Sequence, residues 1–192
     1  SEPVKEVKLS MKVIGVVGLP ASGKGEFSKI ASERGIPVIV MGDMIRKAVS
    51  EAGLLPDDAN FGATANRLRA EGGMDAIAKL CVPEIQKLSA PLVLIDGIRG
   101  DSEVALFRKV FSGFFLISID SSFENRLGRI VARARSDDFT SADALRNRDE
   151  RETKWGLLDA LKSADRHISN EGTLEEFSRA VQALLEQIGR DP

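Results

Sequence analysis

Residues 11–27, MKVIGVVGLPASGKGEF, decide the fold of this chain. The apolar run 13–17 predicts a buried strand, and the residues after Lys24 can form a helix, so a glycine-rich turn joins strand to helix. Glycines let such a turn curl until successive N–H groups point into one concavity, and the helix N-terminus adds partial positive charge. The spacing Gly-x4-Gly-Lys in this context predicts a phosphate-binding loop, with Lys24 at the outer phosphates. The residues expected to contact the nucleotide are Gly18, Pro20, Ala21, Ser22, Gly23, Lys24, Gly25 and Glu26.

The residues that follow Lys24 depart from the usual form of this loop. A hydroxyl side chain that contacts magnesium commonly comes next, whereas this chain has Gly25 and then Glu26. Gly-Lys-Gly, with Pro20 two residues after the first glycine, resembles the phosphate loop of adenylate kinase and its nucleoside monophosphate kinase relatives. In those kinases threonine typically stands at the Glu26 position, and the metal is held largely through water and phosphate oxygens. The resemblance implies ATP and Mg²⁺ as cofactors, and Glu26 adds negative charge beside them.

Composition indicates one globular domain without a membrane span. The 192 residues are 43% hydrophobic, which is enough for one buried core but short for two full domains. We expect a flexible extension over residues 1–10 and a single domain over 11–192. A formal charge of −2 argues against a general nucleic-acid or membrane-surface binder. The lone Cys81 and the lack of an apolar signal core indicate a cytoplasmic protein with a buried thiol. We expect a monomer or a homodimer.

Four short apolar runs separated by helical patterns predict an α/β protein, and a resemblance of the C-terminal part implies a fifth strand. This alternation favours a three-layer sandwich around a five-stranded parallel sheet over a closed barrel. The resemblance to P-loop kinases implies the strand order 2-3-1-4-5. The expected strands lie within 13–17, 37–41, 91–97, 114–120 and 164–170. The expected helices are 26–34, 42–49, 63–71, 74–88, 101–110, 124–135, one long helix over 141–163, and 174–188 capped by Thr173 and Glu176. A turn-rich break is expected over 54–61.

The segment after the second strand looks like the part of adenylate kinases that grips the acceptor monophosphate. Residues 41–46 read MGDMIR, and by this match Arg46 pairs with the acceptor phosphate while Asp43 starts the acceptor helix. The alternative is that Asp43 only caps the helix and Arg46 faces solvent. The helices of about 42–89 resemble an insertion that covers the acceptor in this superfamily. Further candidate acceptor contacts there are Arg67 and Arg69, which could also be ordinary surface arginines.

The third strand ends in an acid, Asp96. Four apolar residues followed by aspartate are the pattern in which the carboxylate lies beside the phosphate loop and orients magnesium or its waters. The sequence Asp96-Gly97-Ile98-Arg99 resembles the Asp-Gly-Phe-Pro-Arg stretch of adenylate kinases, one residue shorter. The resemblance implies that Arg99 contacts phosphate and belongs both to the catalytic residues and to those that bind the acceptor.

Arginines recur on one face of the predicted helix 124–135. Arg126, Arg129 and Arg133 fall at i, i+3 and i+7, with Arg135 just beyond, and such a row is costly unless an anion or acidic partners lie among the guanidiniums. The sequence Arg-Ile-Val-Ala-Arg looks like the start of the adenylate kinase lid, here a short lid of about 133–140. By that match Arg129 lies along the donor base, and Arg133 and Arg135 clamp the transferred phosphoryl. The alternative is a solvated basic helix.

The C-terminal part is similar to dephospho-coenzyme A kinases. In that family a short lid precedes a long helix, a last strand reading Ala-Asp-x-x-Ile-x-Asn and a turn near the adenine, here placed at Asn170 and Gly172. His167, the one histidine, is expected to be structural.

The mixture of adenylate kinase-like and dephospho-coenzyme A kinase-like parts resembles a little-characterised group of archaeal P-loop kinase-like proteins. It implies a phosphotransferase that moves the γ-phosphoryl of ATP to a small nucleotide-like acceptor, either a nucleoside monophosphate such as AMP or dephospho-coenzyme A. Positioning and charge neutralisation carry such a transfer, with Lys24, Asp96, Arg99, Arg133 and Arg135 as the catalytic set. Glu26 keeps an alternative open, a nucleotide-dependent switch or slow NTP hydrolase that acts on a macromolecular partner.

Overall fold

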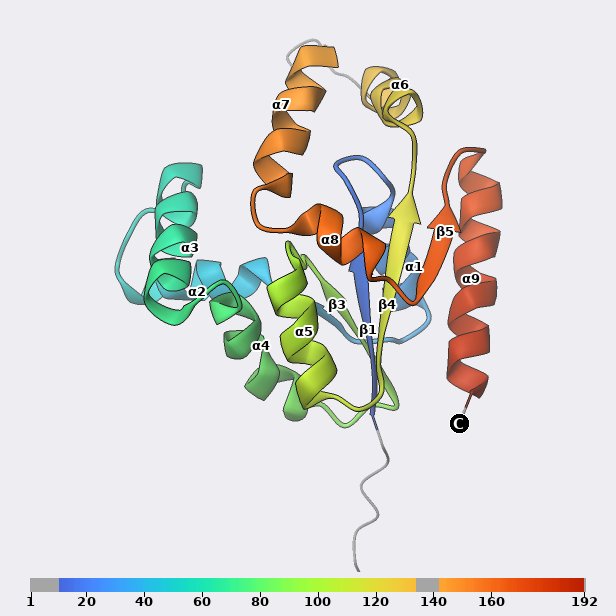
Figure 1. The fold of residues 1–192 in the computed structure, drawn as a ribbon. Coiled ribbons are helices and arrows are strands. Elements are labelled where there is room, and N and C mark those ends of the chain that lie inside the picture. Colours follow the sequence, from blue (N-terminus) through green and yellow to red (C-terminus); the bar gives the residue numbers. More distant parts are fainter. Residues whose placement is uncertain (1–10, 134–141, 192) are drawn as a thin grey trace, which may run out of the picture.

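The computed structural model describes residues 11–133 and 142–191, and they form a five-stranded parallel sheet in the order β2-β3-β1-β4-β5. This order confirms the predicted one, and the helices lie on both faces of the sheet (Figure 1). The strands are β1 Lys12–Val17, β2 Val38–Val40, β3 Leu92–Asp96, β4 Phe114–Asp120 and β5 Arg166–Ser169. The N-terminal extension predicted for 1–10 lies outside the described residues.

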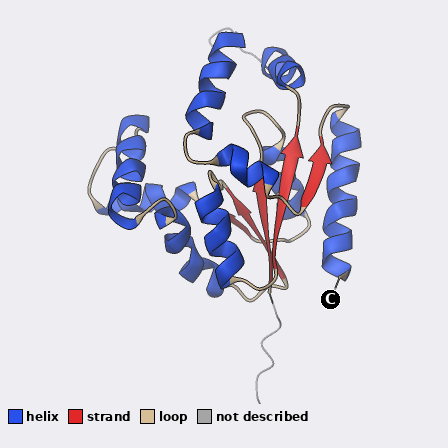
Figure 2. Cartoon of the chain, viewed as in Figure 1, coloured by secondary structure: helices blue, strands red, loops and turns tan. Residues whose placement is uncertain are grey.

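Strands β1 to β4 are mostly apolar because helices cover both faces of the sheet there, whereas the edge strand β5 reads RHIS and buries only Ile168. Side chains alternate between the faces, so Val13 and Val17 of β1 enter one core while Ile14 and Val16 enter the other. The first core is closed by α4 Ala76–Gln86, α5 Asp101–Val110 and α8 Leu157–Lys162. The second is closed by α1 Lys24–Glu33 and α9 Leu174–Arg190. The result is the predicted three-layer sandwich, seen in Figure 2 as red strands between blue helices.

Between β2 and β3 the chain forms a group of helices at one side of the sheet (Figure 1). They are α2 Gly42–Glu51, α3 Asp58–Gly72 and α4. The break expected over 54–61 is shorter than predicted, because Asp57 caps α3 and its carboxylate accepts a hydrogen bond from Asn60 N at 2.8 Å. Helix α3 therefore starts five residues earlier than the sequence analysis placed it.

The single long helix predicted over 141–163 is wrong. The structure has α7 Ala142–Thr153 and then α8, separated by a turn in which Gly156 has φ 92°. A left-handed residue cannot continue an α-helix, and glycine adopts this conformation at little cost. The turn packs tightly against the start of α5, because a Cβ at Gly100 would overlap the carbonyl oxygen of Trp155.

The remaining predicted helices agree with the structure within a few residues. Helix α6 runs Phe123–Arg133, and α9 begins at Leu174 after the N-cap Thr173, whose hydroxyl accepts from Glu176 N at 3.1 Å. None of the helices in the part of the chain that the structure describes is long and apolar enough to cross a membrane.

Candidate functional site

The loop between β1 and α1 has the backbone that the glycine spacing predicts. Gly23 has φ 117° and Ala21 has φ 61°, so the chain curls into a concavity just before α1 begins at Lys24. A Cβ at Gly18 would overlap the hydroxyl of Ser22, which is itself buried with no hydrogen-bond partner among the described residues. The Lys24 ammonium donates to Gly18 O at 2.6 Å and so crosses the mouth of the loop.

Lys24 lies in a partly desolvated and highly charged setting. Burial lowers the pKa of its ammonium, and the nearby Arg99 and Arg148 guanidiniums act in the same direction, while the carboxylates of Glu152 and Asp96 oppose the shift. The structure therefore brings the predicted Lys24, Asp96 and Arg99 together. It adds two side chains of α7, Arg148 and Glu152, that the sequence did not single out because nothing in a charged helix marks the face that meets the loop.

Asp96 ends β3 directly beside the phosphate loop, since it pairs with Val16 of β1. Its carboxylate accepts a hydrogen bond from Ser28 Oγ of α1 at 3.2 Å. No cluster of three or more His, Cys, Asp or Glu that could hold a metal occurs within 11–133 and 142–191. One carboxylate and one hydroxyl are the donor set expected where Mg²⁺ keeps several waters and binds mainly through substrate phosphates. These residues fit a water-mediated Mg²⁺ site.

A pocket of about 210 Å³ opens at the carboxyl end of β2 and β3. Open α/β sheets bind ligands at this edge. Two predicted acceptor contacts, Arg46 and Arg99, line it together with the candidate Arg69 and with Asp96. The other residues that line it are Val40, Met41, Gly42, Ile45, Ile77, Gly97 and Glu103.

Arg67 and Asp43 are exposed, and neither of them lines the pocket. Arg67 is exposed, lies 3.8 Å from Glu71 of the same helix and is not among the residues that line the pocket. Asp43 is exposed and accepts from Arg46 at 2.6 Å, a pair that pre-positions the Arg46 guanidinium at the pocket rim. Asp43 makes no side-chain cap of α2, so its structural alternative as a helix cap does not apply.

Arg69 is held from outside its own helix. Its guanidinium lies over the Trp155 ring at 4.7 Å, which ties α3 to the turn between α7 and α8. Burial lowers the pKa of this guanidinium, and its Nε has no hydrogen-bond partner among the described residues. A buried cationic group with free donor capacity suits an anionic ligand.

Glu103 is a pocket residue that the sequence analysis missed. Its side chain is 2% exposed, and Oε1 accepts from Arg99 N at 2.7 Å, so it fixes the turn that carries Arg99. Burial raises the pKa of the carboxyl. A sequence signal existed, since Glu103 stands three residues after Gly100, the N-cap of α5, as in a capping box.

Arg126 joins three parts of the site. It is 3% exposed and binds Asp149 of α7 through two hydrogen bonds of 2.8 and 2.9 Å. It also donates to Pro20 O of the phosphate loop and to Ser121 O, each at 3.2 Å. The acidic partner demanded by a row of arginines is thus Asp149, and Arg126 holds α6, α7 and the loop together.

The other arginines of α6 divide into a held one and an exposed one. Arg129 donates to Ala21 O at 3.1 Å, to Ser121 Oγ at 2.8 Å and to Asn170 O, so it braces the loop from the side of β4 and β5. Asn170 is buried and donates to Ser22 O at 2.8 Å. Arg133 is exposed at the end of α6, whereas Arg135 and the rest of the predicted lid, 134–140, lie outside the described residues.

The remaining predicted residues surround this arrangement. Gly25 is exposed and has open space around it, while Glu26 is partly buried in the first turn of α1. Gly172 lies before α9, where a Cβ would overlap the Glu176 carboxylate. His167 of β5 is half exposed, and its Nδ1 atom lies 2.8 Å from Asp120 Oδ2 at the end of β4.

A glycine-rich phosphate loop on the first strand of a 2-3-1-4-5 sheet, with a lysine and a strand-end aspartate beside it, defines a P-loop protein of kinase-like type. The AAA domain family matches residues 14–155. A UPF0200 protein of Methanoregula boonei is 62% identical over 182 residues, which cover 95% of this chain and all of that protein. The chain therefore belongs to the UPF0200 protein family.

Solved structures share the fold at low identity. TT1252 from Thermus thermophilus superimposes with a TM-score of 0.64 at 22% identity, over 92% of this chain and 97% of that one. A gluconokinase from Sinorhizobium meliloti gives 0.53 at 17% identity, over 95% of both chains. These likenesses confirm the fold class, a P-loop kinase-like sandwich.

Proposed function

We propose that the chain is an ATP-dependent phosphotransferase that acts on a nucleotide-like acceptor. The observation that carries this proposal is the continuity of two sites. Lys24 and Asp96 lie at the phosphate loop, and Asp96 and Arg99 also line the pocket beside it, where Arg46 and Arg69 supply further positive charge. A donor phosphate on the loop and an acceptor in the pocket would meet at Asp96 and Arg99.

The chain's own residues supply positioning and charge neutralisation. The backbone N–H groups of the loop and Lys24 would hold the β- and γ-phosphates, and Asp96 with Ser28 would hold Mg²⁺ through its waters. Bound magnesium would neutralise the charge that develops on the phosphate oxygens. Arg99, Arg133 and Arg135 neutralise the transferred phosphoryl, and Arg129, Asn170 and Gly172 lie on the donor-nucleotide side.

The chemistry of the pocket favours an acceptor that bears a phosphate. Three arginines point to an anion, and the apolar residues Ile45 and Ile77 suit a flat or hydrophobic body behind it. AMP and dephospho-coenzyme A both have this character, in keeping with the resemblances to adenylate kinase and dephospho-coenzyme A kinase. A monophosphate acceptor needs no base, whereas a sugar hydroxyl could give its proton to Asp96 or Asp43.

A steady-state assay tests the proposal. Purified protein is incubated with Mg²⁺, ATP and either AMP or dephospho-coenzyme A among a panel of nucleotides, and the phosphorylated product is followed by chromatography. We expect transfer to at least one acceptor, loss of transfer in Lys24→Ala, and retained transfer in Lys29→Ala, which removes an exposed lysine from the same helix. ATP hydrolysis with no transfer to any member of the panel would count against a phosphotransferase.

One observation favours a second candidate, a nucleotide-dependent switch or slow NTP hydrolase that acts on a macromolecular partner. Glu26 places a carboxylate in the first turn of α1, next to the phosphate loop, where it opposes a bound triphosphate and slows transfer. A stable protein or ribonucleoprotein partner whose release depends on ATP would support this alternative, and clean turnover of a small acceptor would exclude it.

A further inference from the structure

Glu152 of α7 lies among the cations of the phosphate site. Its Oε2 atom is 3.5 Å from Arg99 Nη1, and its Oε1 atom is 3.6 Å from Arg148 Nε. The side chain is 18% exposed, and Oε2 is shielded from solvent without a hydrogen-bond partner among the described residues. The Glu152 carboxylate also acts on the Lys24 ammonium: burial lowers the pKa of that group, and Glu152 opposes the shift more than Asp96 does. The Glu152 carboxylate therefore interacts with three cationic side chains, those of Arg99, Arg148 and Lys24.

The Oε2 atom of Glu152 is poorly solvated in this place. Burial costs a charged group free energy unless ion pairs and hydrogen bonds compensate, and within 11–133 and 142–191 this oxygen has the Arg99 ion pair and no hydrogen bond. An ordinary helix pair between Arg148 and Glu152 would leave both groups in water, as the exposed pair Arg146 and Asp143 of the same helix is. Cations grouped around one partly buried carboxylate are what we expect of an anion-binding site that an acidic side chain of the same protein occupies.

Contacts on both sides of Glu152 anchor α7 and keep the carboxylate beside these cations. The hydrogen bonds of Arg126 to Asp149 and to Pro20 O attach α7 to the phosphate loop three residues before Glu152. On the other side of Glu152, the Trp155 ring packs under the Arg69 guanidinium. The carboxylate is therefore held over Lys24 and Arg99 from both ends of its helical turn.

We propose that Lys24, Arg99 and Arg148 form the anion site of the phosphoryl group in transfer, and that the Glu152 carboxylate occupies this site until a triphosphate displaces it. The inference rests on the proposed function, because it assigns an occupant to the same phosphate site. It adds Arg148 to the phosphate-binding residues, and it makes Glu152 an internal competitor of the nucleotide. The displacement is non-covalent, so no bond forms or breaks.

Competition follows from the charges. A γ-phosphate that approaches Lys24 and Arg99 meets a carboxylate already bound there, and two anions within about 4 Å repel one another unless one leaves. Binding of ATP must therefore release Glu152 toward solvent, and the free energy of that release lowers the affinity for the nucleotide. Removing the charge at Glu152 should strengthen binding.

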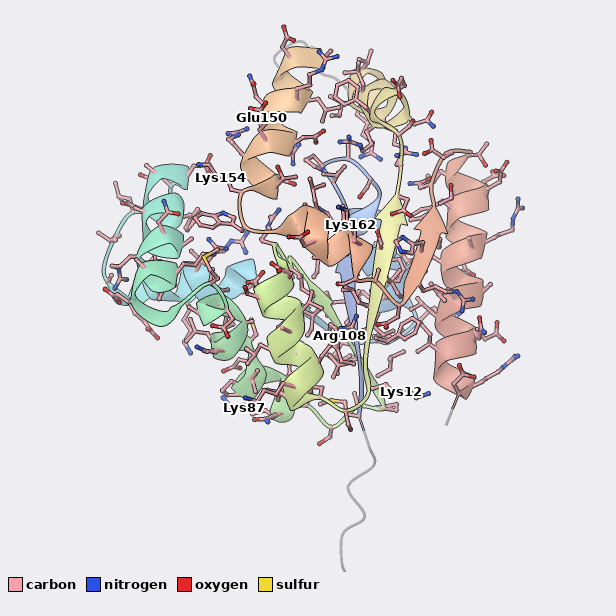
Figure 3. All side chains as sticks on the ribbon, in the orientation of Figure 1. Lys12, Lys87, Arg108, Glu150, Lys154 and Lys162 are labelled. Carbon is pink, nitrogen blue, oxygen red and sulfur yellow. The ribbon has the colours of Figure 1, made fainter. Side chains whose placement is uncertain are left out.

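Calorimetric titration of ATP, with and without Mg²⁺, into Glu152→Gln tests the inference. The matched control is Glu150→Gln, which removes the same charge from an exposed position on α7 (Figure 3). We expect Glu152→Gln to bind ATP about tenfold more tightly than the wild type, as for one partly screened charge pair, and Glu150→Gln to bind as the wild type does. Glu152→Asp, which withdraws the carboxylate by one methylene, should give an intermediate gain and serves where the first variant does not fold.

The outcomes separate this inference from the proposed function. Wild-type binding with equal or weaker binding by Glu152→Gln and Glu152→Asp overturns the internal competitor, while the phosphate site stands. Absence of ATP binding by every variant, the wild type included, overturns the proposed function itself. For Arg148, the variant Arg148→Gln should weaken ATP binding about tenfold in the Glu152→Gln background, whereas Arg151→Gln, an exposed change on the same helix, should leave it unchanged. Unchanged binding in the Arg148 variant removes Arg148 from the site.

Discussion

Among single substitutions near the site, we expect the loss of Arg126 to lower the free energy of unfolding the most. Its guanidinium is 3% exposed and makes four hydrogen bonds, two of them to Asp149, whose side chain is 20% exposed. The variant Arg126→Met keeps much of the apolar stem but leaves the Asp149 carboxylate without its cation and the Pro20 and Ser121 carbonyls without a donor.

The expected cost follows from these contacts. Breaking a buried ion pair from one side costs about 3–5 kcal/mol, and the partial exposure of Asp149 favours the lower end of that range. We therefore expect the free energy of unfolding to fall by about 3 kcal/mol in Arg126→Met, which is a large share of the stability of an ordinary domain.

Urea unfolding of the two single variants and of the double variant Arg126→Met with Asp149→Leu measures the effect. Because the double variant leaves no unpaired charge behind, its loss should be smaller than the sum of the single losses by about 1.5–3 kcal/mol. Arg146→Met is the control, since Arg146 and Asp143 are exposed and their pair contributes about 0.5 kcal/mol or less. A loss below about 1 kcal/mol in Arg126→Met, or additive losses in the cycle, would refute the role assigned to Arg126.

Three further changes test other parts of the structure. Gly100→Ala should destabilise the protein by about 1–3 kcal/mol in urea unfolding, because its Cβ would overlap the Trp155 carbonyl, whereas Gly25→Ala in open helical space should be neutral or stabilise by up to about 1 kcal/mol. Burial raises the pKa of the Cys81 thiol to about 12, so the native protein at pH 8 should react with a thiol reagent only as fast as it unfolds, as followed by absorbance. Burial also raises the pKa of Glu103 above its ordinary value of 4.5, so the native state holds that proton more tightly than the unfolded chain does. As the pH rises above about 4.5, the wild type should therefore lose stability relative to Glu103→Gln.

Each of these predictions has an outcome that contradicts it. Equal stability of the two glycine variants would mean that the turn between α7 and α8 does not press on α5. Rapid modification of Cys81 in the folded state would contradict the burial of this α4 residue in the core. A difference in stability between wild type and Glu103→Gln that does not change with pH would show that the carboxyl has an ordinary pKa in the native state.

The fold was predictable because the first four strands are each marked twice in the sequence, whereas the expectation for the polar strand β5 rests on a resemblance. In each of the four, a β-branched apolar run gives the position, and a glycine, aspartate or charged stretch gives the end, as in the run 13–17 before the loop and in β3 before Asp96. Where the prediction was wrong, the deciding signal was a single residue. Gly156 divides the helix predicted as continuous, and Asp57 begins α3 early, and neither residue stands out without knowledge of its backbone angles.

Site residues were predictable where they belong to a sequence motif or end a strand. They were less predictable where only tertiary packing brings them to the site. Lys24 and Asp96 follow from the loop and the strand end, which fix their place in any sheet of this kind. Sequence could not choose between Arg67 and Arg69, because both lie on α3 and tertiary contacts distinguish them: Arg69 lines the pocket and lies over Trp155, whereas Arg67 pairs with Glu71 of its own helix. Glu152 was out of reach, since its meaning depends on how α7 lies over the phosphate loop.

The most direct test of the account is calorimetric titration of ATP and of GTP, each with Mg²⁺, into the wild type, Lys24→Ala and Lys29→Ala. We predict one site for at least one of the two nucleotides in the wild type and in Lys29→Ala, and loss of that binding in Lys24→Ala, because the Lys24 ammonium crosses the mouth of the phosphate loop. Absence of binding by the wild type, or equal binding by Lys24→Ala, would contradict the assignment of this loop as a nucleotide site.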